Sequence, residues 1–288
     1  MTLRVAITGA GGFLGAALAR RLLAEGADVL ALSRRAPDIH GVRWQYYELA
    51  KPPNPPAALA GIDVVVHAAF AMGGAGYALE ELNCSAARSL HVAARSLGAH
   101  FIFISSMSSH KEAVSSYGRA KWRIEAGLDA GVDAIVRPGL VIGPGGSYAR
   151  MFSVLRRAPV LPLFYGGLQP LQPVGIEDLT EGLSRLVLRR MPGVYNIGIP
   201  VPITIREFYG RMLAAAGLHR LLVPFPGDAA VSVLRVCEAA GLHLPVTAEN
   251  ILGLKFLRSF ETVDSLERLN LILAPLDKLA WASPSSKI

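Results

Sequence analysis

Short apolar runs alternate with longer, helix-like stretches along the first half of the chain. The apolar runs cover residues 3–7, 28–32, 42–47, 63–67, 101–105 and 133–137, and the helix-like stretches include 16–25 and 116–128. Alternation of this kind is typical of parallel strands that are joined by right-handed helical crossovers. We therefore predict an α/β fold whose main domain is a Rossmann-type, doubly wound parallel sheet.

The regular alternation fades after residues 143–146, which read Gly-Pro-Gly-Gly. Helices and short strands are mixed beyond this point, which indicates a smaller C-terminal lobe of mixed α/β structure. We place the main domain at residues 1–165 and the lobe at residues 166–288, with segments near 174–198 returning to the main domain. The proline-rich residues 51–56 predict a stiff surface connection without chemistry.

Composition fits a globular protein of this kind. The 288 residues, of which 52% are hydrophobic and 18% charged, can bury a sizeable core. No stretch has the length of a membrane span, and an apolar run that begins at residue 3 leaves no room for a signal peptide. Cys84 and Cys237 lack metal-ligand spacing, so we expect no metal site and a reducing, cytoplasmic location.

The net charge of +7 comes mainly from arginines that are scattered along the chain. Because these arginines form no Lys/Arg run, nucleic-acid binding is only a minor alternative. The partner that we expect is a small-molecule substrate. A homodimer is left open.

A glycine-rich turn joins the first apolar run to the first helix-like stretch. Residues 8–15 read Thr-Gly-Ala-Gly-Gly-Phe-Leu-Gly, and Gly9, Gly12 and Gly15 are spaced by three. This spacing allows a tight turn, a close backbone approach to a pyrophosphate and close packing of helix on strand. The phosphates would bind at the helix N-terminus. Glycine turns also occur in α/β proteins that bind no nucleotide, so the turn alone leaves dinucleotide binding open.

A basic tripeptide, Ser33, Arg34 and Arg35, follows the second apolar run. An NAD-binding protein usually carries an acidic residue near this spacing to hold the ribose 2′-hydroxyl, and no acid is present here. Guanidinium groups suit a 2′-phosphate, which favours NADP, with NAD as the alternative cofactor. The other interpretation is a solvated basic loop.

Tyr117 and Lys121 are four residues apart and share one face of the predicted helix. A nearby ammonium favours a phenolate, so the tyrosine could act as a general acid or base, while the lysine holds a ribose hydroxyl. Ser105 and Ser106 end the preceding strand at the edge where ligands bind in open α/β sheets. A serine hydroxyl there can donate to a substrate oxygen.

These segments, taken in order, resemble the extended type of short-chain dehydrogenase/reductase, the NAD-dependent epimerase/dehydratase-like family. The resemblance runs from residue 3 to about residue 198. It includes the glycine turn and residues 63–69, 83, 101–106, 117–121, 137–139, 174–179 and 196–198. It implies a Rossmann domain that binds NAD(P), a lobe that binds substrate, and Ser106, Tyr117 and Lys121 as catalytic residues.

The cofactor contacts that we expect come from the glycine turn, the basic tripeptide and the loops at the same sheet edge. They are Gly9, Gly12, Phe13, Leu14, Gly15, Ser33, Arg34, Arg35, Ala68, Ala69, Asn83, Ser105, Tyr117, Lys121, Pro138 and Gly139. His67, which lies beside them, is expected to be a packed structural residue.

The chain departs from the family pattern at two places. Met107 and Ser108 follow Ser106, where nucleotide-sugar dehydratases of this family carry an acidic pair. Residues 169–173 lack the arginine that epimerases use to hold a diphosphate, which makes nucleotide sugars less favoured. Residues 159–162, 172–174 and 244–247 instead resemble the atypical branch related to the nucleotide-binding accessory subunit of respiratory complex I.

The sequence thus favours an NADP-dependent oxidoreductase that acts on a carbonyl or a secondary alcohol. Ser106 would polarise the substrate oxygen, Tyr117 would exchange its proton, and the cofactor would carry the hydride. Two alternatives stay open. One is a nucleotide-sugar epimerase-like enzyme, and the other is a non-catalytic NAD(P)-binding structural or assembly protein.

Overall fold

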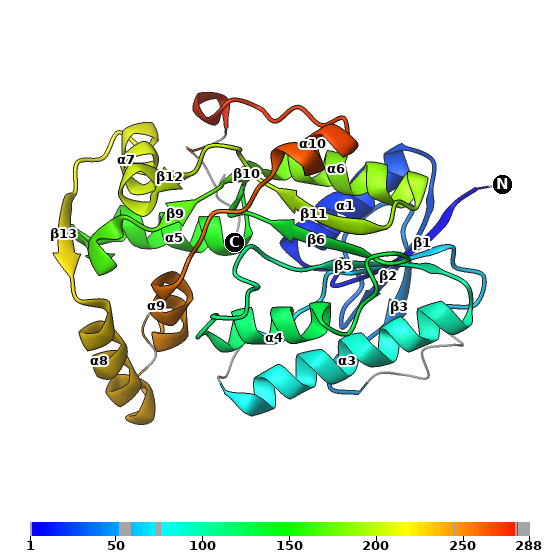
Figure 1. Cartoon of the computed structure of the whole chain (residues 1–288), viewed down its shortest axis with the longest axis horizontal. Coiled ribbons are helices and arrows are strands. Elements are labelled where there is room, and N and C mark those ends of the chain that lie inside the picture. The colour runs from blue at the N-terminus through cyan, green and yellow to red at the C-terminus, as the bar shows by residue number, and fades with distance from the viewer. Residues whose placement is uncertain are drawn as a thin grey trace.

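A seven-stranded, all-parallel sheet forms the centre of the molecule (Figure 1). The computed structural model describes residues 2–51, 59–72, 76–242, 244, 246–279 and 281. In spatial order the strands are β11 (Gly193–Ile197), β6 (Ala134–Pro138), β5 (His100–Ile104), β4 (Val64–His67), β1 (Arg4–Thr8), β2 (Asp28–Ser33) and β3 (Arg43–Tyr46). The predicted Rossmann-type sheet is confirmed, and each predicted strand agrees with the observed one to within a residue or two.

Helices cover both faces of this sheet, which is why its central strands are nearly continuous apolar runs, whereas the edge strand β3 is exposed. The helices α1 (Phe13–Ala24) and α6 (Ile176–Arg189) pack on one face, where they meet side chains such as Val5 and Ile7. The helices α3 (Tyr77–Ser96) and α4 (Ser116–Glu125) pack on the other face, around Ala6 and Phe101. Alternate strand residues therefore point into two separate apolar cores.

A smaller lobe adjoins the end of the sheet that lies away from the N-terminus (Figure 1). Its helices are α5 (Gly146–Arg157), α7 (Ile205–Ala215), α8 (Gly227–Ala239) and α9 (Ala248–Lys255). Its short strands pair as β7 (Val141–Ile142) with β10 (Val174–Gly175), β9 (Pro170–Leu171) with β12 (Ile203–Thr204), and β8 (Val160–Phe164) with β13 (Leu221–Phe225). Two short 3₁₀ helices cover Tyr165–Gly167 and Leu276–Lys278.

The chain passes between the two parts more than once. β11 lies beside β6 in the main sheet, and α10 (Val263–Arg268) returns to pack near β11. The lobe has a core of its own around Tyr148, Phe208 and Trp281. This core also takes side chains from α5 and β8, which precede the division that we predict at residue 165. That division stays a prediction.

Two features concern ligands and membranes. Among the described residues, no helix is both long and apolar enough to cross a bilayer. No group of three or more His, Cys, Asp or Glu side chains in the described ranges is arranged to hold a metal ion. Of the proline-rich loop at 51–56, only Lys51 falls within the described residues.

Candidate active site

The glycine turn between β1 and α1 has the geometry that a phosphate cradle needs. Gly9 has a φ of +72°, and a Cβ at this position would lie 2.9 Å from the backbone of Ala69. A Cβ at Gly15 would overlap the Gly9 carbonyl oxygen, so Gly15 lets α1 pack against the end of β1. The fold itself requires glycine less strictly at position 12, because an added Cβ there would contact only the Gly9 oxygen, at 3.2 Å.

The N-terminus of α1 is also left ready for an anion. No side chain caps it at Gly12, and the residues Phe13 and Leu14 begin its first turn. Amide N–H groups of a first helical turn have no partner inside the helix, and the helix dipole favours negative charge there. The turn therefore fits a dinucleotide pyrophosphate, which α1 amides would hold without any cationic side chain.

The basic tripeptide lies beside this turn. A Cβ at Gly11 would be 3.8 Å from the Ser33 Cβ. Ser33 is buried, its hydroxyl donates to the Arg35 carbonyl at 2.7 Å, and its own carbonyl accepts from the Trp44 indole at 3.2 Å. Because Ser33 is fixed in this way, the neighbouring Arg34 and Arg35 are presented from a well-anchored turn, and both are exposed.

The loop after β4 is held by two buried polar residues. The Ala69 amide donates to the Thr8 hydroxyl at 3.2 Å, and the same hydroxyl is hydrogen-bonded to His67 Nδ1 at 2.8 Å. Asn83 accepts from the Ala71 amide at 2.8 Å and donates to the Leu79 carbonyl. Asn83 therefore shapes the loop that carries Ala68 and Ala69.

His67 behaves as a packed histidine. It is 1% exposed and stacks on Phe101 and Phe103. Burial, aided by the charge of Lys121, lowers its pKa from 6.5 to about 3. The imidazole is therefore neutral at physiological pH.

Tyr117 and Ser106 lie together at the carboxyl edge of the sheet. Ser106 follows β5, and its hydroxyl accepts from the Ser108 amide at 3.1 Å. Tyr117 lies in the first turn of α4 and packs edge-on against Phe70, with ring centroids 4.9 Å apart. Burial raises the pKa of Tyr117, and a hydrogen bond with Ser106 opposes the rise. The phenol is thus protonated and faces the serine hydroxyl.

Lys121 lies one turn after Tyr117 on α4 and is buried. Its ammonium donates to the Ile104 carbonyl at 2.6 Å and lies 4.7 Å from the ring centroids of Phe70 and Phe103. Burial lowers its pKa to about 7, although the charge of Glu125 acts in the opposite direction. The expected shift of Tyr117 toward the phenolate is not seen, because burial dominates and raises the pKa of the phenol.

A buried ion pair, which sequence reasoning missed, supports Lys121 from the next turn of α4. Glu125 accepts from the Ser105 hydroxyl and pairs with Arg137, whose Nε lies 3.0 Å from both carboxylate oxygens. The hydroxyl of Ser105 therefore faces Glu125. The sequence signal that could have placed Glu125 near Lys121 is the spacing, because Glu125 follows Lys121 by four residues and shares its face of the helix.

The loop at Pro138 and Gly139 is locked against the lobe. Met107 N donates to the Pro138 carbonyl at 3.1 Å, and Gly139 N donates to the Ile197 carbonyl at 2.9 Å. A Cβ at Gly139 would overlap the carbonyl oxygen of Gln172, so only glycine fits this approach.

Gln172 uses its whole amide inside the protein. Its Nε2 donates to the carbonyls of Ile199 and Phe260 at 3.0 and 2.8 Å, and its Oε1 accepts from the Phe260 amide at 2.7 Å. This buried side chain thus ties the C-terminal segment to the end of β11. It lies in the segment where the sequence lacks the expected arginine, and it offers no charge to a ligand.

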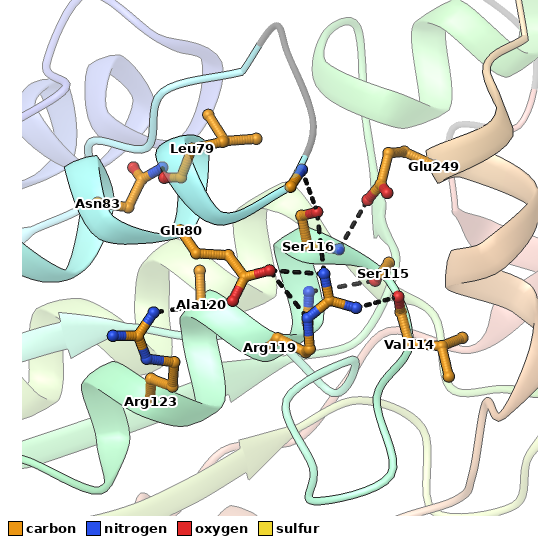
Figure 2. Close-up of polar contacts among 12 residues, drawn as sticks. Leu79, Glu80, Asn83, Val114, Ser115, Ser116, Arg119, Ala120, Arg123 and Glu249 are labelled. Carbon is orange, nitrogen blue, oxygen red and sulfur yellow. Dashed lines mark hydrogen bonds and ion pairs between the residues drawn. The ribbon is translucent and has the colours of Figure 1, made fainter. Parts of the chain in front are cut away.

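The lobe is also tied to the helix that carries Tyr117, as Figure 2 shows. Glu249 of α9 accepts from the Ser116 amide at 2.7 Å and so caps the first turn of α4. Arg119 donates to the buried Glu80 of α3 from Nε and Nη2, at 2.8 and 2.6 Å. The Ser116 hydroxyl accepts from Arg119 and from the Gly76 amide. None of these contacts was expected from the sequence, and all except the bond between Arg119 and Ser116 join segments far apart in the chain.

Comparisons with known proteins show the family of the chain. Residues 5–198 match the model of the NAD dependent epimerase/dehydratase family. A ceramide reductase from Caulobacter vibrioides is 35% identical over 173 residues, which are 55% of this chain and 53% of that protein. The match thus spans about half the length of that relative.

Two further similarities extend over more of the chain. A dTDP-6-deoxy-L-talose 4-dehydrogenase (NAD(P)(+)) from Kitasatospora kifunensis is 30% identical and covers 77% of this chain and 82% of its own. The crystal structure of gox2253 superposes with a TM-score of 0.74 at 20% identity, covering 98% of this chain and 96% of that one, which shows the fold. Because the family model spans well over half of the residues, the chain belongs to the NAD-dependent epimerase/dehydratase family.

Proposed function

We propose that this chain is an NADP-dependent oxidoreductase that transfers a hydride to or from a carbonyl or a secondary alcohol. The observation that carries the proposal is the geometry around Tyr117: the Lys121 Nζ lies 5.8 Å from its ring centroid, both side chains pack on Phe70, and Ser106 is close enough to lower the pKa of the phenol. A positioned phenol and hydroxyl at the carboxyl edge of a parallel sheet can together bind and protonate a carbonyl oxygen.

In the direction of reduction, the Ser106 hydroxyl donates to the substrate oxygen and Tyr117 transfers its proton to it. Tyr117 is then a phenolate. Lys121, with a pKa of about 7, can stabilise this negative charge or return a proton to it. The bound dinucleotide supplies the hydride. His67 takes no part, because its neutral ring is held by Thr8 and by the aromatic side chains of β5.

The cofactor preference rests on the basic tripeptide. Arg34 and Arg35 are exposed next to the glycine turn, and the described residues place no carboxylate in hydrogen-bond contact with either guanidinium. A ribose 2′-phosphate would gain charge-assisted hydrogen bonds there, whereas the 2′-hydroxyl of NAD would find no acidic acceptor. We therefore propose NADP as the preferred cofactor.

The substrate class that the site supports best is a carbonyl compound with apolar substituents. Gln172 has no free donor, Arg137 is paired with Glu125, and Arg258 is paired with Glu112. A sugar-nucleotide diphosphate would thus lack a free cationic partner at these positions. The similarity to a ceramide reductase supports a lipid-like carbonyl.

A nucleotide-sugar dehydrogenase or epimerase is the second candidate, because the relative that matches 77% of this chain is a dTDP-sugar dehydrogenase. The resemblance to the complex I branch, and with it a non-catalytic role, stays a prediction, as does a homodimer in the cytoplasm.

The test begins with mass spectrometry of the cofactor that purified protein releases. The protein is then given NADPH with long-chain ketones in one arm and with 4-keto dTDP- and UDP-sugars in the other. We expect NADPH consumption with the ketones only. Turnover of the sugar nucleotides alone would replace the proposal with the second candidate, and no turnover in either arm would favour the non-catalytic role.

A further inference from the structure

The outer edge of the lobe exposes an apolar surface that the proposed reaction does not use. In the parallel pair β8 and β13, Leu221 faces Val160, Val223 faces Pro162 and Phe225 faces Phe164. Alternate residues of a strand share one side, so these side chains form a single apolar face. Leu221 is 64% exposed, whereas the intervening Leu161 and Leu163 are buried in the core of the lobe.

The helix α8 follows β13 directly in the chain (Figure 1). Its inner side buries Ala230 and Val231 against α9. Its outer side carries Val233 and Val236, which are 60% and 70% exposed and one helical turn apart. A helix that is apolar on both sides normally has a partner on both sides. We call the set of exposed residues Val160, Pro162, Leu221, Val223, Phe225, Val233 and Val236 the lobe patch.

The charges around the lobe patch are mainly positive. Arg156 and Arg157 end α5 just before β8, and Arg220 precedes β13 and donates to the Arg156 carbonyl. Arg235 is exposed on α8. Lys255 pairs with Asp228, while Glu238 accepts from an amide of α9 and keeps its negative charge, so the four arginines still outnumber the unpaired acid of α8.

We propose that the lobe patch docks on the surface of a lipid bilayer that contains anionic headgroups. Apolar side chains that enter the boundary between headgroups and acyl chains, next to arginines that meet lipid phosphates, give binding of this kind. A second copy of the chain fits less well, because a twofold contact would bring the same arginines against each other. The proposal does not depend on the catalytic residues.

Co-sedimentation of the full chain with vesicles tests the proposal. One set of vesicles contains phosphatidylcholine alone, and the other also contains phosphatidylglycerol. We expect at least ten-fold tighter binding to the anionic vesicles. The variant Val233→Glu/Val236→Glu should lose at least ten-fold of this binding. The control Val201→Glu/Ile272→Glu changes two side chains outside the lobe patch that are 77% and 90% exposed, and it should bind like the parent protein.

A second variant separates the electrostatic part. Arg156→Gln/Arg157→Gln should weaken binding to the anionic vesicles about five-fold for each arginine, with no effect on the neutral ones. Failure of the parent protein to bind anionic vesicles would overturn the proposal, as would equal binding by the Val233/Val236 variant and its control. Analytical ultracentrifugation tests the competing occupant, a second copy of the chain. If the parent protein is a dimer, the Val233/Val236 variant is a monomer and neither binds vesicles, the surface serves self-association.

Discussion

The buried pair of Glu125 and Arg137 makes a prediction whose size can be worked out from the structure. Removing one member of a buried ion pair usually costs about 3–5 kcal/mol, because the other charge is left without a partner. Arg137 keeps 23% of its side chain exposed, so its guanidinium can regain some hydration when Glu125 is replaced. We therefore expect Glu125→Ala to lower the free energy of unfolding by about 3 kcal/mol, at the lower end of that range.

A double-mutant cycle measured by urea unfolding tests this value. Arg137→Met alone should also destabilise, since it leaves the carboxylate of Glu125 buried with only Ser105 as a partner. The double variant Glu125→Ala/Arg137→Met should then lose less than the sum of the single variants, with a coupling of about 0.5–3 kcal/mol. If the two losses add within about 0.3 kcal/mol, the pair is not coupled and the reasoning is refuted.

Replacement of Glu125 by glutamine has a pH signature through Lys121. The pKa of this lysine is about 7 in the folded chain and 10.5 ordinarily. Between these values only the unfolded chain holds the proton, so the free energy of unfolding rises with pH and the penalty of the buried charge is fully felt below pH 7. Because Glu125 raises the pKa of Lys121, Glu125→Gln should extend this pH dependence to lower pH. An unchanged profile would show that the two groups do not interact.

Three further predictions concern the cofactor site and His67. Gly12→Val should abolish the thermal stabilisation by NADP while the apo fold survives, whereas Gly15→Val, which forces α1 off the turn, should lower Tm without any ligand. Arg34→Ala should weaken NADP by about 1.5–3 kcal/mol for each charge-assisted bond lost and leave NAD unchanged in calorimetric titrations, and equal affinities of the parent protein for both cofactors would contradict this. His67, whose pKa is depressed to about 3, binds a proton on unfolding below pH 6.5. Acidification from pH 6.5 to 4 should therefore lower the free energy of unfolding, measured in urea, by about 3 kcal/mol. If His67→Gln shows the same loss, His67 is not its source.

Much of the Rossmann domain could be predicted because its signals are local. The glycine turn and the strand that precedes it are adjacent in sequence, and Tyr117 and Lys121 lie one helical turn apart. The position of Ser106 at the carboxyl edge required only that it follow a strand of a parallel sheet. The local reading failed at the electrostatics of Tyr117, since its pKa depends on burial by Phe70 and other side chains that come from elsewhere in the chain.

The lobe contacts lay beyond what the sequence could indicate. Glu249 reaches the first turn of α4, and Gln172 binds Phe260, across long separations in sequence. No periodicity marks such pairs, because each depends on how the lobe closes against the sheet. The pairing of β8 with β13 is of the same kind, and so the lobe patch became visible only in three dimensions.

The central claim is that Tyr117 is the proton donor of a carbonyl reductase. The most direct measurement is the steady-state turnover of Tyr117→Phe with the best substrate of the carbonyl panel, with NADP affinity measured on the same preparation. Loss of one hydroxyl removes the transferable proton and leaves the ring packed on Phe70. The account predicts that kcat falls about 10²–10⁴-fold while NADP binding is nearly unchanged. A Tyr117→Phe variant that retains full turnover would contradict it.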